Sequence, residues 1–141
     1  LQGLDLVDND RMAIAGHCMG GRVSFLGAAS IEAFKCNVVY YGGNMFKIWG
    51  NGDAAPFDML GNLRGPVIGF YGKDDENPSL DDVAKIDAKL TKLGITHDFH
   101  SYDGAGHAFQ NFTSVAGYRA AVTEDSLGKM IGLAGEESVD G

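Results

Sequence analysis

The feature that most constrains the fold is an alternation of short apolar segments with longer helix-like ones. Strands are expected at residues 12–15, 37–41, 66–71 and 95–102, and helices near 20–34, 79–93 and 118–133. Residues 44–65 show no clean period and are expected to form a long loop with one short helical turn. Apolar strands that alternate with helices are typical of a mostly parallel sheet with helices on both faces. The sequence therefore predicts one three-layer α/β domain over residues 1–141.

Composition excludes several classes of protein. The 21 glycines are about twice the usual share, which favours a fold with many tight turns. With 11 basic and 19 acidic residues the net charge is −8, so nucleic-acid binding is not expected. No apolar run is long enough to span a membrane, and no signal peptide is recognised, so we expect a cytoplasmic protein. Two cysteines are too few for a disulfide framework, and no zinc-ligand spacing occurs, so no metal is expected.

The sharpest local motif is the run G-H-C-M-G-G at residues 16–21. It follows an apolar strand and opens a helix, which is the setting of a nucleophile elbow. Cys18 would project from the carboxyl end of the strand, and the backbone N–H of Met19 would donate to an oxyanion. The alternative is a buried structural cysteine in a glycine-rich turn.

Two later motifs supply the partners that a cysteine nucleophile needs. Asp74 and Asp75 both follow the strand at 66–71, and either could orient a histidine while the other lies in a solvated turn. His107 follows the last strand in a glycine-flanked loop. Nucleophile, acid and histidine in this order are typical of α/β-hydrolases. Because sites in open α/β sheets lie outside the carboxyl ends of the strands, all three can converge there.

These motifs resemble those of the dienelactone hydrolase family. The similarity runs from about residue 7 to residue 133 and includes V-D-N-D-R-M at 7–12, Y-G-K-D-D-E-N-P at 71–78 and S-Y-D-G-A-G-H-A-F at 101–109. The resemblance implies Cys18 as nucleophile, His107 as base and Asp75, by its Gly-x-x-Asp spacing, as the orienting acid. It further implies cofactor-free hydrolysis of a lactone or small carboxylic ester through an acyl-cysteine.

The chain also departs from that family. Members have about half of their sheet before the elbow strand, where this chain has eleven residues. We therefore expect a partial α/β-hydrolase fold that starts near the nucleophile strand, with a second oxyanion donor and part of the pocket unaccounted for. Turnover is then expected to be weak. The alternative is a non-catalytic relative that folds, self-associates and at most binds ligand. A thiol-redox role is disfavoured because no second cysteine lies near Cys18.

Three further expectations concern the surroundings of the motif. His17 and Phe109 are candidate substrate-pocket residues. Cys36 should be a small hydrophobe at the start of its strand, whereas Cys18 lies at the carboxyl end of the strand before it. The two cysteines are therefore expected at opposite edges of the sheet, too distant for a disulfide. The strand at 12–15 would be an apolar sheet edge, which soluble proteins avoid exposing, so we expect a homo-oligomer that covers this edge.

Overall fold

The computed structural model describes residues 2–136, which contain a four-stranded parallel sheet in the order β1-β2-β3-β4. The strands are β1 (Met12–His17), β2 (Phe34–Tyr40), β3 (Val67–Gly72) and β4 (His97–Tyr102). Between and after them lie α1 (Met19–Ser30), a 3₁₀-helix η1 (Pro56–Asn62), α2 (Leu80–Leu93) and α3 (Ala120–Glu136). The predicted α/β class is confirmed.

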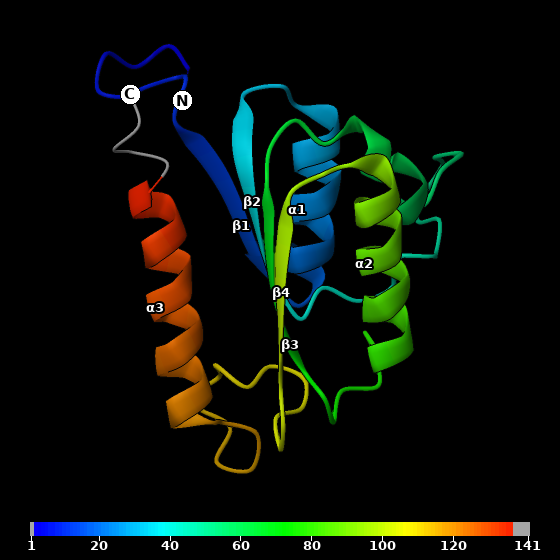
Figure 1. The fold of residues 1–141 in the computed structure, drawn as a ribbon, viewed down its shortest axis with the longest axis vertical. Coiled ribbons are helices and arrows are strands. Elements are labelled where there is room, and N and C mark those ends of the chain that lie inside the picture. Colours follow the sequence, from blue (N-terminus) through cyan, green and yellow to red (C-terminus); the bar gives the residue numbers. More distant parts are fainter. Residues whose placement is uncertain (1, 137–141) are drawn as a thin grey trace.

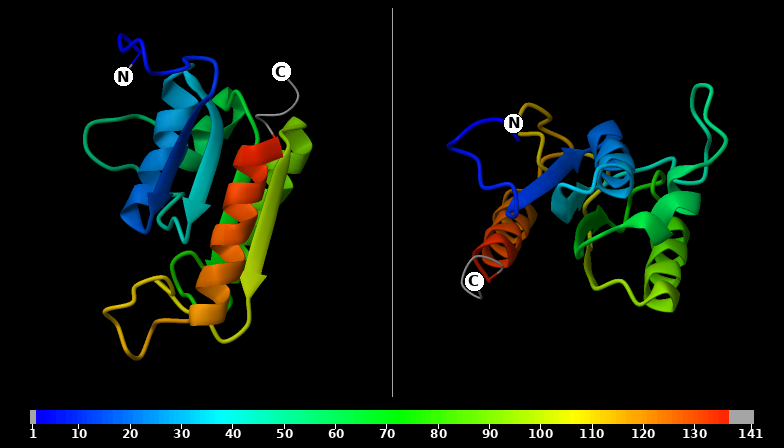
Figure 2. Two further views of the ribbon diagram at one scale, coloured as in Figure 1. Left: turned by 90° about the vertical axis from the view of Figure 1, so that its left-hand side faces the viewer. Right: turned by 90° about the horizontal axis from the view of Figure 1, so that it is seen from above.

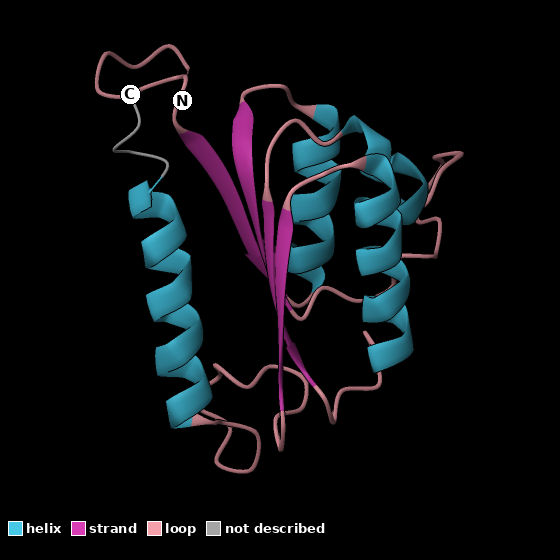
Figure 3. Ribbon diagram, in the orientation of Figure 1, coloured by secondary structure: helices cyan, strands magenta, loops and turns pink. Residues whose placement is uncertain are grey.

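The sheet is the middle of three layers (Figure 1, Figure 3). Helices α1 and α2 cover one face and α3 covers the other, as the view along the sheet in Figure 2 shows. Each interlayer space has its own hydrophobic cluster. One is centred on side chains such as Phe25, Ile86 and Leu90, and the other on Tyr40, Phe70 and Phe109. Burial of these two faces is the main favourable contribution to folding.

Several boundaries differ from the sequence prediction. Helix α1 ends at Ser30, four residues earlier than expected, and the chain is already extended at Ile31. Strand β2 therefore begins at Phe34, where Phe34 and Cys36 pair with Met12 and Ala13. The polar residues at the start of β2 hid this part of the strand, because they interrupt the apolar run. Within the predicted long loop, the only described helix is η1.

The ends of α2 follow the predicted capping chemistry. The Ser79 side chain accepts a hydrogen bond from the Asp82 N–H, and the Asp82 carboxylate accepts one from the Ser79 N–H. Gly94 ends the helix with φ of 69°, a left-handed conformation that favours glycine. Helix α2 is the connection between β3 and β4, two paired strands that both end at the edge of the sheet with the candidate residues.

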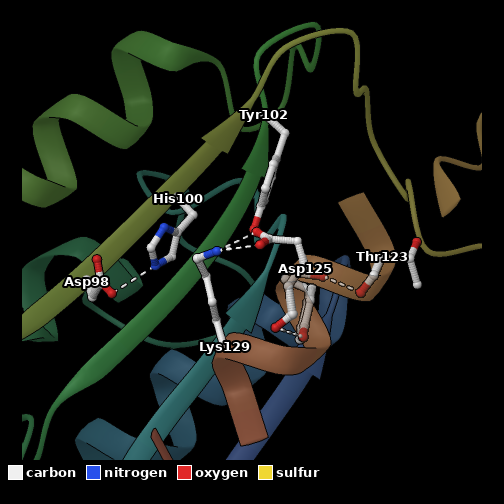
Figure 4. Close-up of polar contacts among 8 residues, drawn as sticks. Asp98, His100, Tyr102, Thr123, Asp125 and Lys129 are labelled. Atoms are coloured by element: carbon white, nitrogen blue, oxygen red, sulfur yellow. Dashed lines mark hydrogen bonds and ion pairs between the residues drawn. The ribbon is translucent and has the colours of Figure 1, made fainter. Parts of the chain in front are cut away.

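A polar cluster links α3 to the sheet (Figure 4). The Tyr102 hydroxyl at the end of β4 donates to Asp125 of α3 at 2.8 Å, and Lys129 donates to the same carboxylate at 2.6 Å. Nearby, His100 on β4 pairs with Asp98 at 2.8 Å. The bond between Tyr102 and Asp125 joins the first half of α3 to the carboxyl end of β4.

Strand β1 lies at one edge of the sheet. Within residues 2–136 it pairs with β2 and with no other strand. Ala13 and Ala15 are exposed along it, while Met12 and Ile14 are partly buried. Whether another chain covers this edge stays a prediction.

Candidate active site

Cys18, Asp75 and His107 come together after the carboxyl ends of β1, β3 and β4. These strand ends lie at the lower end of the sheet in Figure 1. Cys18 lies between β1 and α1, Asp75 follows β3, and His107 follows β4. The Cys18 Sγ lies 2.7 Å from His107 Nε2, and His107 Nδ1 lies 2.8 Å from Asp75 Oδ2. The three side chains therefore form one hydrogen-bonded chain, in the order thiol, imidazole, carboxylate.

The backbone at Cys18 makes the sharp turn that a nucleophile elbow requires. Its φ is 59° and its ψ is −122°, a conformation that non-glycine residues rarely adopt. The Cys18 N–H donates to the Tyr40 carbonyl at 3.0 Å, which fixes the turn against β2. A Cβ at Gly16 would overlap the Gly20 carbonyl group, so this close approach of strand and helix requires glycine.

Met19 is the first residue of α1, as the elbow motif predicts. An N–H in the first turn of a helix has no acceptor within that helix, so the Met19 N–H is available to a ligand atom beside Cys18. Its side chain is exposed. The backbone and not the side chain is therefore the part of Met19 that the site can use.

The structure distinguishes the two candidate carboxylates. Asp75 is 8% exposed; its Oδ2 faces His107, and its Oδ1 accepts the Asn77 N–H at 2.8 Å. Asp74 is exposed, and its N–H donates to the Ala105 carbonyl at 3.0 Å. Asp75 is therefore the carboxylate that orients the imidazole, and Asp74 ties the β3 turn to the loop that carries His107.

The electrostatics of the site favour a protonated imidazole. The hydrogen bond to Asp75 raises the pKa of His107 from its ordinary 6.5 to about 9, against the opposing effect of partial burial. The hydrogen bond with Cys18 acts in the same direction as Asp75. A proton that reaches His107 is therefore held well into the alkaline range.

The two predicted pocket residues lie in different environments. His17 is exposed beside Cys18; it stacks on Tyr40 with ring centroids 4.4 Å apart, and its Nε2 lies 2.7 Å from Gln110 Oε1. Phe109 is 0% exposed and belongs to the hydrophobic cluster under α3. The expectation that Phe109 lines a substrate pocket is therefore corrected. Its ring packs in the core against other buried aromatic rings, and so anchors the loop that carries His107.

Sequence reasoning missed two residues at this edge. Tyr41 directly follows β2, and its ring centroid lies 5.3 Å from that of His107. Gln110 bridges two elements, since its Oε1 meets His17 and its Nε2 donates to Ser126 of α3 at 3.1 Å. The position of Tyr41 just before Gly42 was the available signal, because β2 also ends at this edge of the sheet.

Three other features are not found in the part of the chain that the structure describes: a metal-binding group, a membrane-spanning helix and a disulfide. No group of three or more His, Cys, Asp or Glu side chains is arranged to hold a metal ion there. Among the same residues, no helix combines the length and apolarity needed to cross a membrane. Cys18 and Cys36 are not joined by a disulfide.

Comparison with known proteins finds relatives that cover most of the chain. The model of the dienelactone hydrolase family matches residues 1–138. A Methylorubrum extorquens protein, provisionally named a carboxymethylenebutenolidase, is 34% identical over 112 residues, which cover 77% of this chain and 37% of that protein. An Escherichia coli K12 protein with the same provisional name is 32% identical over 128 residues, covering 88% of this chain and 45% of that protein.

A solved structure extends the likeness to three dimensions. The crystal structure of a Klebsiella pneumoniae protein, provisionally named a dienelactone hydrolase, superposes with a TM-score of 0.83 at 29% identity. The match covers 91% of this chain and 53% of that structure. The chain thus spans less than half the length of the two curated relatives and about half of the solved one. With a family model that matches nearly all of its residues, the chain belongs to the dienelactone hydrolase family.

Proposed function

We propose that this chain carries the acyl-transfer centre of a hydrolase that cleaves a lactone or a small carboxylic ester through an acyl-cysteine. The observation that carries the proposal is the continuous contact from Cys18 Sγ through the His107 ring to Asp75, at 2.7 and 2.8 Å. Both separations lie within hydrogen-bond reach, which is the geometric requirement for a nucleophile and its base. Family membership supports the substrate class.

Acylation begins from a thiolate–imidazolium pair, in which the proton of the Cys18 thiol is held on His107 Nε2 and Asp75 stabilises the charged ring. The sulfur then attacks the carbonyl carbon, and the carbonyl π electrons move onto oxygen, where the Met19 N–H donates to the developing charge. As the tetrahedral intermediate collapses, the bond between carbon and the leaving oxygen breaks. The imidazolium of His107 returns its proton to that oxygen, so the products are a neutral alcohol and a thioester on Cys18. In a lactone the alcohol stays tethered to the acyl group.

Deacylation repeats these steps with water. His107 accepts a proton from water, the resulting hydroxide attacks the thioester carbonyl, and the carbon–sulfur bond breaks. The sulfur takes the proton back through His107, and a carboxylic acid leaves. Throughout, Asp75 holds Nδ1 as a donor, which leaves Nε2 free to exchange protons with sulfur or water.

Turnover by the 141-residue polypeptide is expected to be slow. The elbow provides one backbone donor to the oxyanion, that of Met19. A hydrolase that lacks its second oxyanion donor typically loses about 10²–10³ in rate. Acylation by an activated ester depends least on a second donor, because its leaving group needs little help. The acylation step is therefore the appropriate one to measure.

The test is a burst assay with a nitrophenyl ester on the wild-type chain, Cys18→Ala and the matched control Cys36→Ala. We expect a burst of nitrophenol near one equivalent for wild type and for Cys36→Ala, and none for Cys18→Ala. Equal release by all three chains would refute the acyl-cysteine proposal. Ligand binding without any release would favour a non-catalytic relative.

A further inference from the structure

Tyr41 occupies a conformation that its size makes unfavourable. Its φ is 41°, in the left-handed region where glycine is common and bulky residues are rare. Two glycines follow it, at 42 and 43, yet neither is among the glycines with positive φ. Strained residues of this kind concentrate at functional sites, where the surrounding structure holds them in place.

The strain places an aromatic ring against the catalytic imidazole. The Tyr41 and His107 rings meet edge to face, with centroids 5.3 Å apart and planes inclined at 60°. On another side the Tyr41 ring meets Phe109, at 5.0 Å and 77°. Both arrangements are the tilted geometry that aromatic pairs prefer. Tyr41 is 3% exposed, so its ring is fixed by packing and not by solvent contact.

A backbone hydrogen bond fixes the position of Tyr41 at the end of β2. The Tyr41 N–H donates to the Phe70 carbonyl of β3 at 2.8 Å, which extends the sheet by one residue beyond β2. The Tyr41 ring meets those of His107 and Phe109, which both lie in the loop after β4. Tyr41 therefore connects the rigid sheet to the loop that carries the imidazole.

The Tyr41 hydroxyl does not exchange a proton in the pH range where His107 titrates. Burial raises the pKa of Tyr41 to about 12, so the side chain stays neutral over the range in which His107 titrates. The contribution of Tyr41 to the site is then one of packing and orientation.

We propose that Tyr41 is a positioning residue whose ring holds the His107 imidazole with Nε2 toward Cys18 and Nδ1 toward Asp75. The inference rests on the proposed function for its effect on rate, but the orientation of the ring can be measured separately. Without the Tyr41 ring, the imidazole gains freedom to rotate about its side-chain bonds. Small misplacements of reacting groups can cost about 10²-fold in rate.

The test compares Tyr41→Asn with Tyr41→Phe. Asparagine tolerates positive φ, so Tyr41→Asn removes the ring while keeping the backbone turn. Tyr41→Phe returns the ring without the hydroxyl. Thermal unfolding and circular dichroism establish that each variant folds. Should Tyr41→Asn not fold, Tyr41→Gly, which also tolerates positive φ and has no ring, takes its place with the same expected outcomes.

Two readouts are taken on each variant: the acylation burst with a nitrophenyl ester as a function of pH, and the His107 titration by NMR. Tyr41→Asn is expected to slow acylation by about 10- to 100-fold and to shift the His107 titration below that of wild type. Tyr41→Phe is expected to restore both. A wild-type rate and titration in Tyr41→Asn would overturn the proposal, and so would a loss in Tyr41→Phe equal to that in Tyr41→Asn.

The two proposals fail separately. If the wild-type chain shows no burst that depends on Cys18, the proposed function fails, and the NMR titration still decides the role of Tyr41. If the burst occurs but Tyr41→Asn leaves rate and titration unchanged, only the positioning role fails.

Discussion

Replacing Asp75 by asparagine removes the carboxylate that faces His107 and hardly changes the size of the side chain. A hydrogen bond to a charged group contributes about 1.5–3 kcal/mol, and one pKa unit corresponds to about 1.36 kcal/mol. The substitution is therefore expected to lower the pKa of His107, now raised to about 9 by Asp75, by roughly one to two units. The lower part of this range is favoured because the His107 side chain is 36% exposed and water screens the pair.

The same substitution should reverse the imidazole's hydrogen-bonding role. Oδ1 of residue 75 accepts the Asn77 N–H at 2.8 Å, so the new amide NH₂ would face His107 Nδ1. Nδ1 must then accept, and the proton of the neutral ring moves to Nε2, opposite the Cys18 sulfur. Such a ring cannot take the thiol proton. Acylation should fall by roughly 10²–10⁴, the usual contribution of a general base.

NMR titration of the His107 ring protons from about pH 5 to pH 10 measures the shift directly. Asp98→Asn is the matched control, because Asp98 pairs with His100 at the same 2.8 Å and not with His107. An unchanged His107 pKa in Asp75→Asn would refute the reasoning. An equal shift in Asp98→Asn would show that general charge, and not the specific contact, sets the pKa.

Three further predictions concern stability and assembly. Gly16→Ala places a Cβ on the Gly20 carbonyl group and should lower the free energy of unfolding in urea by about 3 kcal/mol or more. Gly20→Ala, whose Cβ would meet no atom within 4 Å, should raise it by about 0.5–1 kcal/mol, and equal effects of the two changes would contradict the elbow geometry. Because the pKa of His107 is raised from 6.5 to about 9, its stabilisation is present below pH 6.5 and lost as pH rises through 9; a flat unfolding free energy across that window would contradict this. Ala13→Lys on the exposed edge of β1 should reduce self-association in sedimentation velocity, and a monomer at every concentration for both chains would remove the edge as an interface.

Motifs whose chemistry is local could be located from the sequence. The elbow at residues 16–21 and the capping box of α2 each depend on neighbours within a few positions, so residue types alone predict them. The convergence of Cys18 and His107 followed from strand order, because parallel strands end at one edge of a sheet. Strand and helix boundaries were less accurate where polar residues interrupt an apolar run, as at the start of β2.

Residues whose role depends on packing could not be located in this way. Phe109 follows His107 by two positions, and only the structure shows its ring buried in the cluster under α3. Tyr41 takes its place beside His107 through an unusual backbone angle, which side-chain type gives no reason to expect. Sequence reasoning from the residues alone left Asp74 and Asp75 open, because adjacent carboxylates after a strand differ only in which way the turn directs them.

The central claim, that Cys18 is the nucleophile, is tested most directly by trapping its acyl adduct. The chain is mixed with a nitrophenyl ester, quenched in acid within the burst, digested and analysed by tandem mass spectrometry. The account predicts the acyl mass on the peptide that contains Cys18, and its loss in His107→Ala at neutral pH, since the thiol then lacks the base 2.7 Å away. An adduct on Cys36 instead, or ester cleavage with no adduct on Cys18 at any quench time, would contradict it.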